Sequence, residues 1–283
     1  MEQVLRGGTV VDGSGRPAEV ADVHLRDGSV VAVGTVDPPA GAEVLDVTGL
    51  VVSPGFIDLH THFDAQVLWD PDLTPSGWHG VTTVVQGNCG FGLAPTRPED
   101  RETIMETLKN VEGMNVETLR AGIRWDFESF PEYLALVASL PKRLNVGTFL
   151  GHTPLRTYVM GPVDAATRAA TPEEVARMAG LLAEGLAAGA VGFSSSQAPS
   201  HMGAAGRPVP SRLADDDEVT ALLGVVSRSR RPLVEITYGH LYDLEEVAAL
   251  SRDLSVRITW GSLLTGLHGG PGASLELLER ASA

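Results

Sequence analysis

Apolar and polar residues alternate along the first part of the chain, up to about Val52. The segments "VVDGSGRP" and "LRDGSVV" place Asp-Gly turn signals between the alternating residues, which is typical of short strands joined by tight turns. We therefore predict that residues 1–52 form a small β-sandwich portion that precedes a different kind of domain.

From residue 53 onwards, apolar strand-like runs alternate with helical patterns. The helical patterns carry good start signals, such as Thr171 followed by Pro172 and Glu174. Strands that alternate with amphipathic helices indicate βα units and a parallel sheet. A closed (β/α)8 barrel has eight such units. Residues 53–283 contain about six, so the predicted fold class is α/β, with an incomplete TIM-like barrel. The six strand candidates are "GFIDLH", "TTVVQG", "RLNVGTFLG", "AVGFSS", "PLVEITY" and "VRITWGSLL".

A long connection leads from Leu93 to Arg143. It contains two helical patterns, roughly Glu99 to Val111 and Phe130 to Ser139. The stretch between them, "GMNVETLRAGIRWDFESF", is predicted to be a loop or lid. Long connections in compact domains are often functional.

Composition narrows the classes of function. The formal net charge of −15 makes nucleic acid an unfavourable partner, because phosphates would be repelled. No apolar run is long enough to span a bilayer, and the start, "MEQVLRGGTV", lacks the blocks of a signal peptide. Cys89 is the single cysteine, so no internal disulfide forms. We expect a cytoplasmic protein that binds neither nucleic acid nor membrane.

The first two predicted strands of the βα series are followed by residue types that commonly bind metals. Asp58, His60 and His62 share strand parity, so we expect their side chains to point the same way. Two imidazoles at this spacing suit one zinc ion. Cys89 ends the next strand between glycines, where we expect an accessible backbone and little cover, and its thiolate is a third candidate ligand. The alternatives are chance histidines at a strand edge and a cysteine that acts as a buried small hydrophobe.

The ends of later strands carry further candidates, because active sites of α/β barrels gather at that face. His152 is a candidate catalytic group that polarises a carbonyl, and Arg156 is a candidate to bind a substrate carboxylate. Their alternatives are a structural histidine and a solvated arginine. Asn88 and Ser195 are candidate substrate-binding groups, or groups that satisfy nearby backbone. His240 is a candidate further metal ligand, or a loop histidine.

The number of metal ions depends on a bridging group. Lys109 and Lys142 are the only two lysines, and neither ends a strand of the series, so no carbamylated lysine is available there. If two ions bind, a thiolate or carboxylate must bridge them, and Cys89 is the obvious candidate.

These residues resemble the amidohydrolase superfamily, in particular its D-aminoacylase (N-acyl-D-amino-acid deacylase) branch. The matching pieces are "VVSPGFIDLHTHFD", "GVTTVVQGNCGFGLAPTRPED", "NVGTFLGHTPLR" and "GAVGFSSS", which cover the N-terminal portion of such proteins. The resemblance implies a distorted (β/α)8 barrel with a β-sandwich built from both chain ends. It implies that His60, His62 and Cys89 are metal ligands, and that His152 is the histidine of a Gly-His motif.

The chain also departs from the family pattern. Family members carry metal-binding histidines at the ends of strands five and six, where this chain has Tyr238 or His240 and then Trp260. They also continue through strands seven and eight and an essential aspartate, which have no counterpart before Ala283.

We therefore expect a metal-dependent amidohydrolase subunit that uses one or two zinc ions. Its expected substrate is a linear amide, an N-acyl-D-amino acid or similar N-acyl compound. A second protein subunit is expected to complete the barrel and to supply the general acid. The alternatives are a non-catalytic or repurposed amidohydrolase-like subunit of a heteromeric complex, and a hydrolase of cyclic amides such as hydantoins or dihydropyrimidines.

Overall fold

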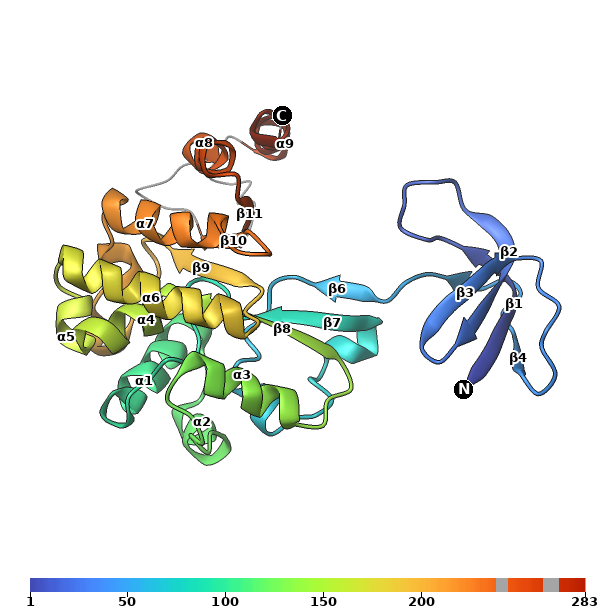
Figure 1. Cartoon of the computed structure of the whole chain (residues 1–283), viewed down its shortest axis with the longest axis horizontal. Coiled ribbons are helices and arrows are strands. Elements are labelled where there is room, and N and C mark those ends of the chain that lie inside the picture. Colours follow the sequence, from blue (N-terminus) through green and yellow to red (C-terminus); the bar gives the residue numbers. More distant parts are fainter. Residues whose placement is uncertain (238–243, 262–269, 283) are drawn as a thin grey trace. The chain divides into compact units, whose positions relative to one another are not determined.

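The computed structural model describes residues 1–237, 244–261 and 270–282. Within it the chain divides into two compact units, Met1–Phe56 and Ile57–Ala283. The first unit is a β-sheet, and the second combines a β-sheet with helices (Figure 1).

The first unit is a five-stranded sheet. Its strands are β1 (Glu2–Val10), β2 (Glu19–Arg26), β3 (Ser29–Gly34), β4 (Glu43–Asp46) and β5 (Val51–Val52). β1, β2 and β3 pair antiparallel in sequence order, whereas β4 and β5 both run parallel to β1. Asp27 and Gly28 join β2 to β3 with φ angles of 49° and 78°, the left-handed conformation that the predicted Asp-Gly turn requires.

The second unit is built on a six-stranded sheet in the order β11-β10-β9-β8-β7-β6. Every pairing from β7 to β11 is parallel. The strands coincide with the six predicted runs, so the predicted α/β fold class, an incomplete barrel of six βα units, is confirmed. Their bounds are β6 (Phe56–Asp58), β7 (Val81–Gln86), β8 (Asn145–Gly151), β9 (Gly192–Ser196), β10 (Leu233–Thr237) and β11 (Arg257–Trp260).

Helices connect these strands and bury their apolar faces against the sheet. Leu150, Phe193 and Val234 of the strands share one core with Leu182 and Leu222 of the helices, and all five side chains are fully buried. Each such side chain stabilises the fold by about 1.5–3 kcal/mol. The helices are α1 (Arg101–Glu112), α2 (Val116–Gly122), α3 (Phe130–Ser139), α4 (His152–Met160), α5 (Pro162–Ala165), α6 (Pro172–Ala188), α7 (Asp216–Ser227), α8 (Leu244–Leu254) and α9 (Pro271–Ser282). No helix within the described ranges is long and apolar enough to cross a bilayer.

The long connection after β7 is more helical than predicted. α1 and α3 confirm the two expected helical patterns, but the prediction of a loop or lid between them is wrong, because α2 lies there. Its start is capped by Asn115, whose side chain accepts a hydrogen bond from the backbone N–H of Thr118. Leu119 is buried and anchors the helix to the core. One apolar anchor in seven residues is too little periodicity to predict a helix from the pattern.

The capping box of α6 generates a stability prediction. The Thr171 hydroxyl accepts the N–H of Glu174, and the Glu174 carboxylate accepts the N–H of Thr171. Thr171→Ala should lower the free energy of unfolding by about 1 kcal/mol in urea denaturation. Thr167→Ala, at an exposed threonine that caps no helix start, is the control. Equal effects of the two substitutions would contradict the capping role.

Candidate metal centre

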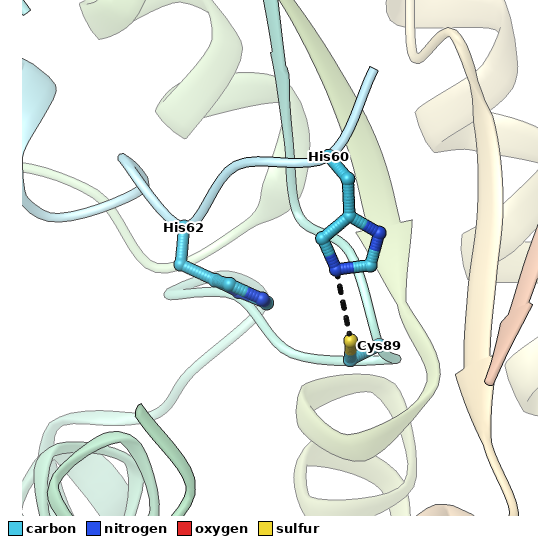
Figure 2. A group of neighbouring side chains, drawn as sticks. All are labelled: His60, His62 and Cys89. Carbon is cyan, nitrogen blue, oxygen red and sulfur yellow. Dashed lines mark hydrogen bonds between the residues drawn. The ribbon is translucent and has the colours of Figure 1, made fainter. Parts of the chain in front are cut away.

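His60, His62 and Cys89 come together at the carboxyl ends of β6 and β7 (Figure 2). One candidate ligand atom from each residue lies within 4.8 Å of the other two. The Cys89 Sγ is 3.2 Å from His60 Nε2, and the two imidazole centroids are 5.3 Å apart. This spacing places three metal-binding side chains around one point, which is what the strand-end argument predicts. The two histidines follow the last residue of β6, so a short irregular segment carries them.

A glycine-rich turn shapes the loop that carries Cys89. Gly87, Cys89 and Gly90 all have positive φ angles, of 80°, 56° and 71°. A Cβ at Gly87 would lie 2.4 Å from the Phe149 carbonyl oxygen, so glycine is required there. Cys89 is buried, with 6% of its surface exposed. The expectation of an accessible backbone and little cover is therefore wrong, because the Cys89 N–H is bonded to Glu235 and Gly90 packs against the backbone of Ser195.

Three carboxylates surround the histidine–cysteine group. Asp64 Oδ2 accepts the backbone N–H of Gly87 at 3.1 Å, and Glu235 Oε2 accepts that of Cys89 at 2.6 Å. Glu235 Oε1 is also 4.0 Å from His60 Nδ1, and Glu112 Oε1 is 3.4 Å from His62 Nε2. In the described part of the chain, no lysine or arginine forms an ion pair with any of these three acids.

Burial shifts the protonation of these groups. It raises the pKa of Asp64 to about 7, of Glu112 to about 7 and of Glu235 to about 8. It also lowers the pKa of His62 to about 3, helped by the nearby His60 and His201. Burial and the Glu235 charge raise the pKa of the Cys89 thiol. Burial is the largest cause of every one of these shifts, because it penalises the charged form of each group.

The residues present fit a divalent metal ion. Imidazoles of low pKa keep their lone pairs free near neutral pH, and imidazole with thiolate is a donor set that zinc prefers. Among the described residues His62 Nδ1 has no hydrogen-bond partner although it is buried, so these residues leave it free to accept an ion. A divalent cation would deprotonate the thiol and balance the buried carboxylates.

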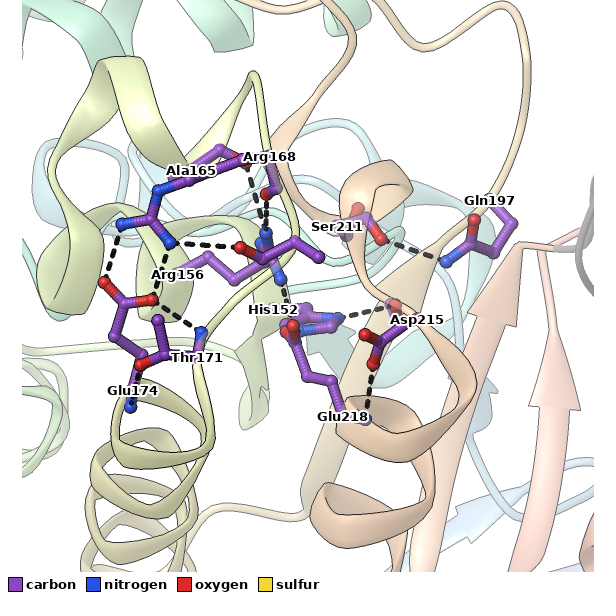
Figure 3. A network of polar contacts seen from close by, with 12 residues as sticks. His152, Arg156, Ala165, Arg168, Thr171, Glu174, Gln197, Ser211, Asp215 and Glu218 are labelled. Carbon is purple, nitrogen blue, oxygen red and sulfur yellow. Dashed lines mark hydrogen bonds and ion pairs between the residues drawn. The ribbon is translucent and has the colours of Figure 1, made fainter.

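His152 and Arg156 are fully buried and belong to a separate polar network (Figure 3). His152 Nδ1 is 2.9 Å from Ser195 Oγ, and its Nε2 is 2.7 Å from Glu218 Oε1. The Arg156 guanidinium pairs with the other oxygen of Glu218 and donates to the Arg168 carbonyl. The carboxylate that Arg156 binds here is thus the chain's own. This geometry favours a structural role for His152 and Arg156 over the predicted catalytic and substrate-binding roles.

The remaining predicted site residues fall in different places. Asn88 is buried, and its side-chain amide donates to the carbonyls of Thr61 and Val85, which ties the ends of β6 and β7 together. Ser195 is buried against His152. His240 lies outside the described residues. Substrate contact by Asn88 and Ser195 stays a prediction.

The site also contains acids to which the sequence analysis gave no role. Asp64 continues the alternating parity of His60 and His62, so the same argument extended by two residues would have found it. Glu235 stands on the fifth strand of the series, but nothing in the pattern marks it as facing His60. Glu112 ends a helix of the long connection, and no sequence signal places it beside His62.

A sequence model of the amidohydrolase family matches residues 43–269. The chain belongs to the amidohydrolase family. It is 34% identical over 291 residues to the N-acyl-D-aspartate deacylase of Alcaligenes xylosoxydans xylosoxydans, a match that covers 99% of this chain and 53% of the relative.

Two solved structures extend the comparison. A D-aminoacylase crystal structure superposes with a TM-score of 0.74 at 31% identity, covering 99% of this chain and 56% of the other. The N-acyl-D-glutamate deacylase of Bordetella bronchiseptica, complexed with zinc and a phosphonate mimic of the tetrahedral intermediate, gives 0.74 at 29%, with coverages of 99% and 55%. The predicted resemblance to the N-terminal portion of the D-aminoacylase branch is confirmed. The chain spans about half the length of these relatives.

The buried Glu218 network generates a second stability prediction. Glu218→Gln keeps the shape of the side chain but leaves the buried Arg156 guanidinium without a charged partner. The loss should be about 3–5 kcal/mol in the free energy of unfolding, measured with urea. Asp217→Asn removes one negative charge from the exposed first turn of the same helix and should change stability by less than about 0.5 kcal/mol.

Proposed function

We propose that this chain forms the metal-binding half of an amidohydrolase that removes the acyl group from N-acyl-D-amino acids. The observation that carries the proposal is the convergence of His60, His62 and Cys89 at the strand ends. The known activities of its relatives, deacylases of N-acyl-D-aspartate and N-acyl-D-glutamate, indicate the substrate class.

His60, His62 and Cys89 would hold a divalent ion, for which we propose zinc. When bound, such an ion polarises an acyl carbonyl and lowers the pKa of water toward neutrality. The chain's own residues prepare the site. Asp64 and Glu235 hold the backbone of the Cys89 loop, and the burial of the thiol keeps bulk water away from it.

We further propose that a second polypeptide chain completes the barrel and supplies the general acid that protonates the departing amine. β6 is an outermost strand of the sheet. Near it, large apolar side chains are more than half exposed, with Ile57 at 61%, Leu59 at 55% and Trp78 at 77%. An apolar strand at a sheet edge favours pairing with further strands.

The activity is tested on protein purified from its own host together with the proposed second chain, with a panel of N-acyl-D-amino acids and the L-isomers as stereochemical controls. We expect release of the free D-amino acid, loss of activity on treatment with 1,10-phenanthroline and recovery with zinc. Cys89→Ala should lose both bound zinc and activity, because it removes one ligand of three. His79→Ala, at an exposed histidine outside the cluster, should change neither. Full zinc content in Cys89→Ala would contradict the proposed centre.

The assembly is tested by native mass spectrometry of protein purified from its own host. We expect a mass well above the 29.8 kDa of this chain. Ile57→Lys should weaken the complex, because it puts a charge on the proposed contact surface. A stable and fully active particle of one 29.8 kDa chain would rule out the second subunit.

A further inference from the structure

Glu235 of β10 contacts two of the three candidate ligands, His60 and Cys89, although β10 and β6 lie near opposite ends of the strand order. Its side chain is 1% exposed. We propose that Glu235 is a positioning residue of the metal centre: it holds His60 with the proton on Nδ1 and fixes Cys89 through its backbone, so that His60 Nε2 and Cys89 Sγ face the ion together. The inference rests on the proposed function, because it requires that this group binds a metal.

The two nitrogens of His60 face different partners. Nδ1 is 4.0 Å from Glu235 Oε1, whereas Nε2 is 3.2 Å from Cys89 Sγ. At 4.0 Å the first contact is an ion-pair distance rather than a hydrogen bond. A carboxylate favours a proton on the imidazole nitrogen nearest to it, and the other nitrogen then keeps its lone pair for a metal.

The same carboxylate holds Cys89 in an unfavourable backbone conformation. The N–H of Cys89 donates to Glu235 Oε2 at 2.6 Å, the short distance of a charge-assisted hydrogen bond. Cys89 has a φ of 56°, a left-handed conformation that is unfavourable for a residue with a Cβ. The bond to Glu235 offsets part of the cost of that conformation and thereby sets where the sulfur points. The Thr237 hydroxyl donates to Glu235 Oε1 at 3.3 Å and orients the carboxylate in turn.

The residue after β11 is Gly261, and its lack of a side chain leaves room for His60 and Glu235. A Cβ at Gly261 would lie 3.0 Å from His60 Cε1 and 3.5 Å from Glu235 Oε1. The backbone of Gly261 therefore passes close over both side chains. His60 is thus enclosed by the ends of β10 and β11 as well as by its own segment.

The other two acids of the site do not share this double contact. Asp64 holds the N–H of Gly87, and Glu112 lies beside His62. Among the described carboxylates, Glu235 contacts both His60 and Cys89, so its removal should disturb two ligands rather than one.

The test compares the zinc affinity of Glu235→Gln and Glu235→Leu with that of the unmodified protein, by competition with a chromophoric chelator. Glutamine keeps an oxygen for the Cys89 N–H but loses the charge, and leucine loses both. We expect the affinity to fall about 10-fold for glutamine and up to about 100-fold for leucine. Asp217→Asn is the control: it removes a carboxylate that contacts neither ligand, without the loss of stability expected for Glu218→Gln, and its zinc affinity should stay within about two-fold.

A second readout follows the His60 tautomer directly. Long-range ¹H–¹⁵N correlation spectra of the metal-free protein, recorded above pH 8 so that Glu235 is ionised, should show the proton on Nδ1, and Glu235→Leu should shift it toward Nε2. Unchanged zinc affinity together with an unchanged tautomer in the folded variants would overturn the inference and leave the proposed function standing. If the unmodified protein binds no zinc, the proposed function falls and this inference falls with it. Should the leucine variant fail to fold, the glutamine variant decides.

Discussion

Buried negative charge without a basic partner is the constraint on which this site depends. Asp64, Glu112 and Glu235 lie around Cys89, and in the described residues no lysine or arginine pairs with them. A buried ion without compensation costs several kcal/mol, so the acids take up protons and their pKa values rise. A divalent cation bound there would remove that penalty. Its binding free energy would then add to the stability of the folded state, because the unfolded chain holds no such site.

The curl of the sheet brings the parts of the site together. β6 and β11 are the two outermost strands, yet a Cβ on Gly261 just after β11 would lie 3.0 Å from His60. Parallel strands that twist and tilt as in a barrel bring their carboxyl ends toward one axis. The candidate ligands follow the first two strands, whereas Glu235 and Gly261, which contact them, come from the last two. The candidate metal centre therefore depends on the whole described sheet.

The strands and the residues that directly follow them could be predicted from the sequence, because they depend on local pattern. Each of the six strands is a short apolar run bounded by turn signals, and the histidines and Cys89 follow the first two of them directly. Because the strands of this sheet are parallel, the residues that follow them lie together at its carboxyl end. The roles of Glu112, Glu235 and Arg156 depend on contacts between residues more than 60 positions apart or on helix placement, which periodicity does not encode. The capping of α2 by Asn115 was visible in the sequence but lacked an apolar repeat to support it.

Glu218 and Glu235 are about equally buried, but their pKa values shift in opposite directions. Burial raises the pKa of both, but at Glu218 the contacts with His152 and Arg156 outweigh burial and the pKa falls below its usual range. At Glu235 only a backbone N–H and a hydroxyl oppose burial, and the pKa rises to about 8. The chain thus neutralises a buried carboxylate with its own arginine where the role is structural. It gives Glu235 no such partner beside the His60 imidazole and the Cys89 thiol, an arrangement that suits a site for an external cation.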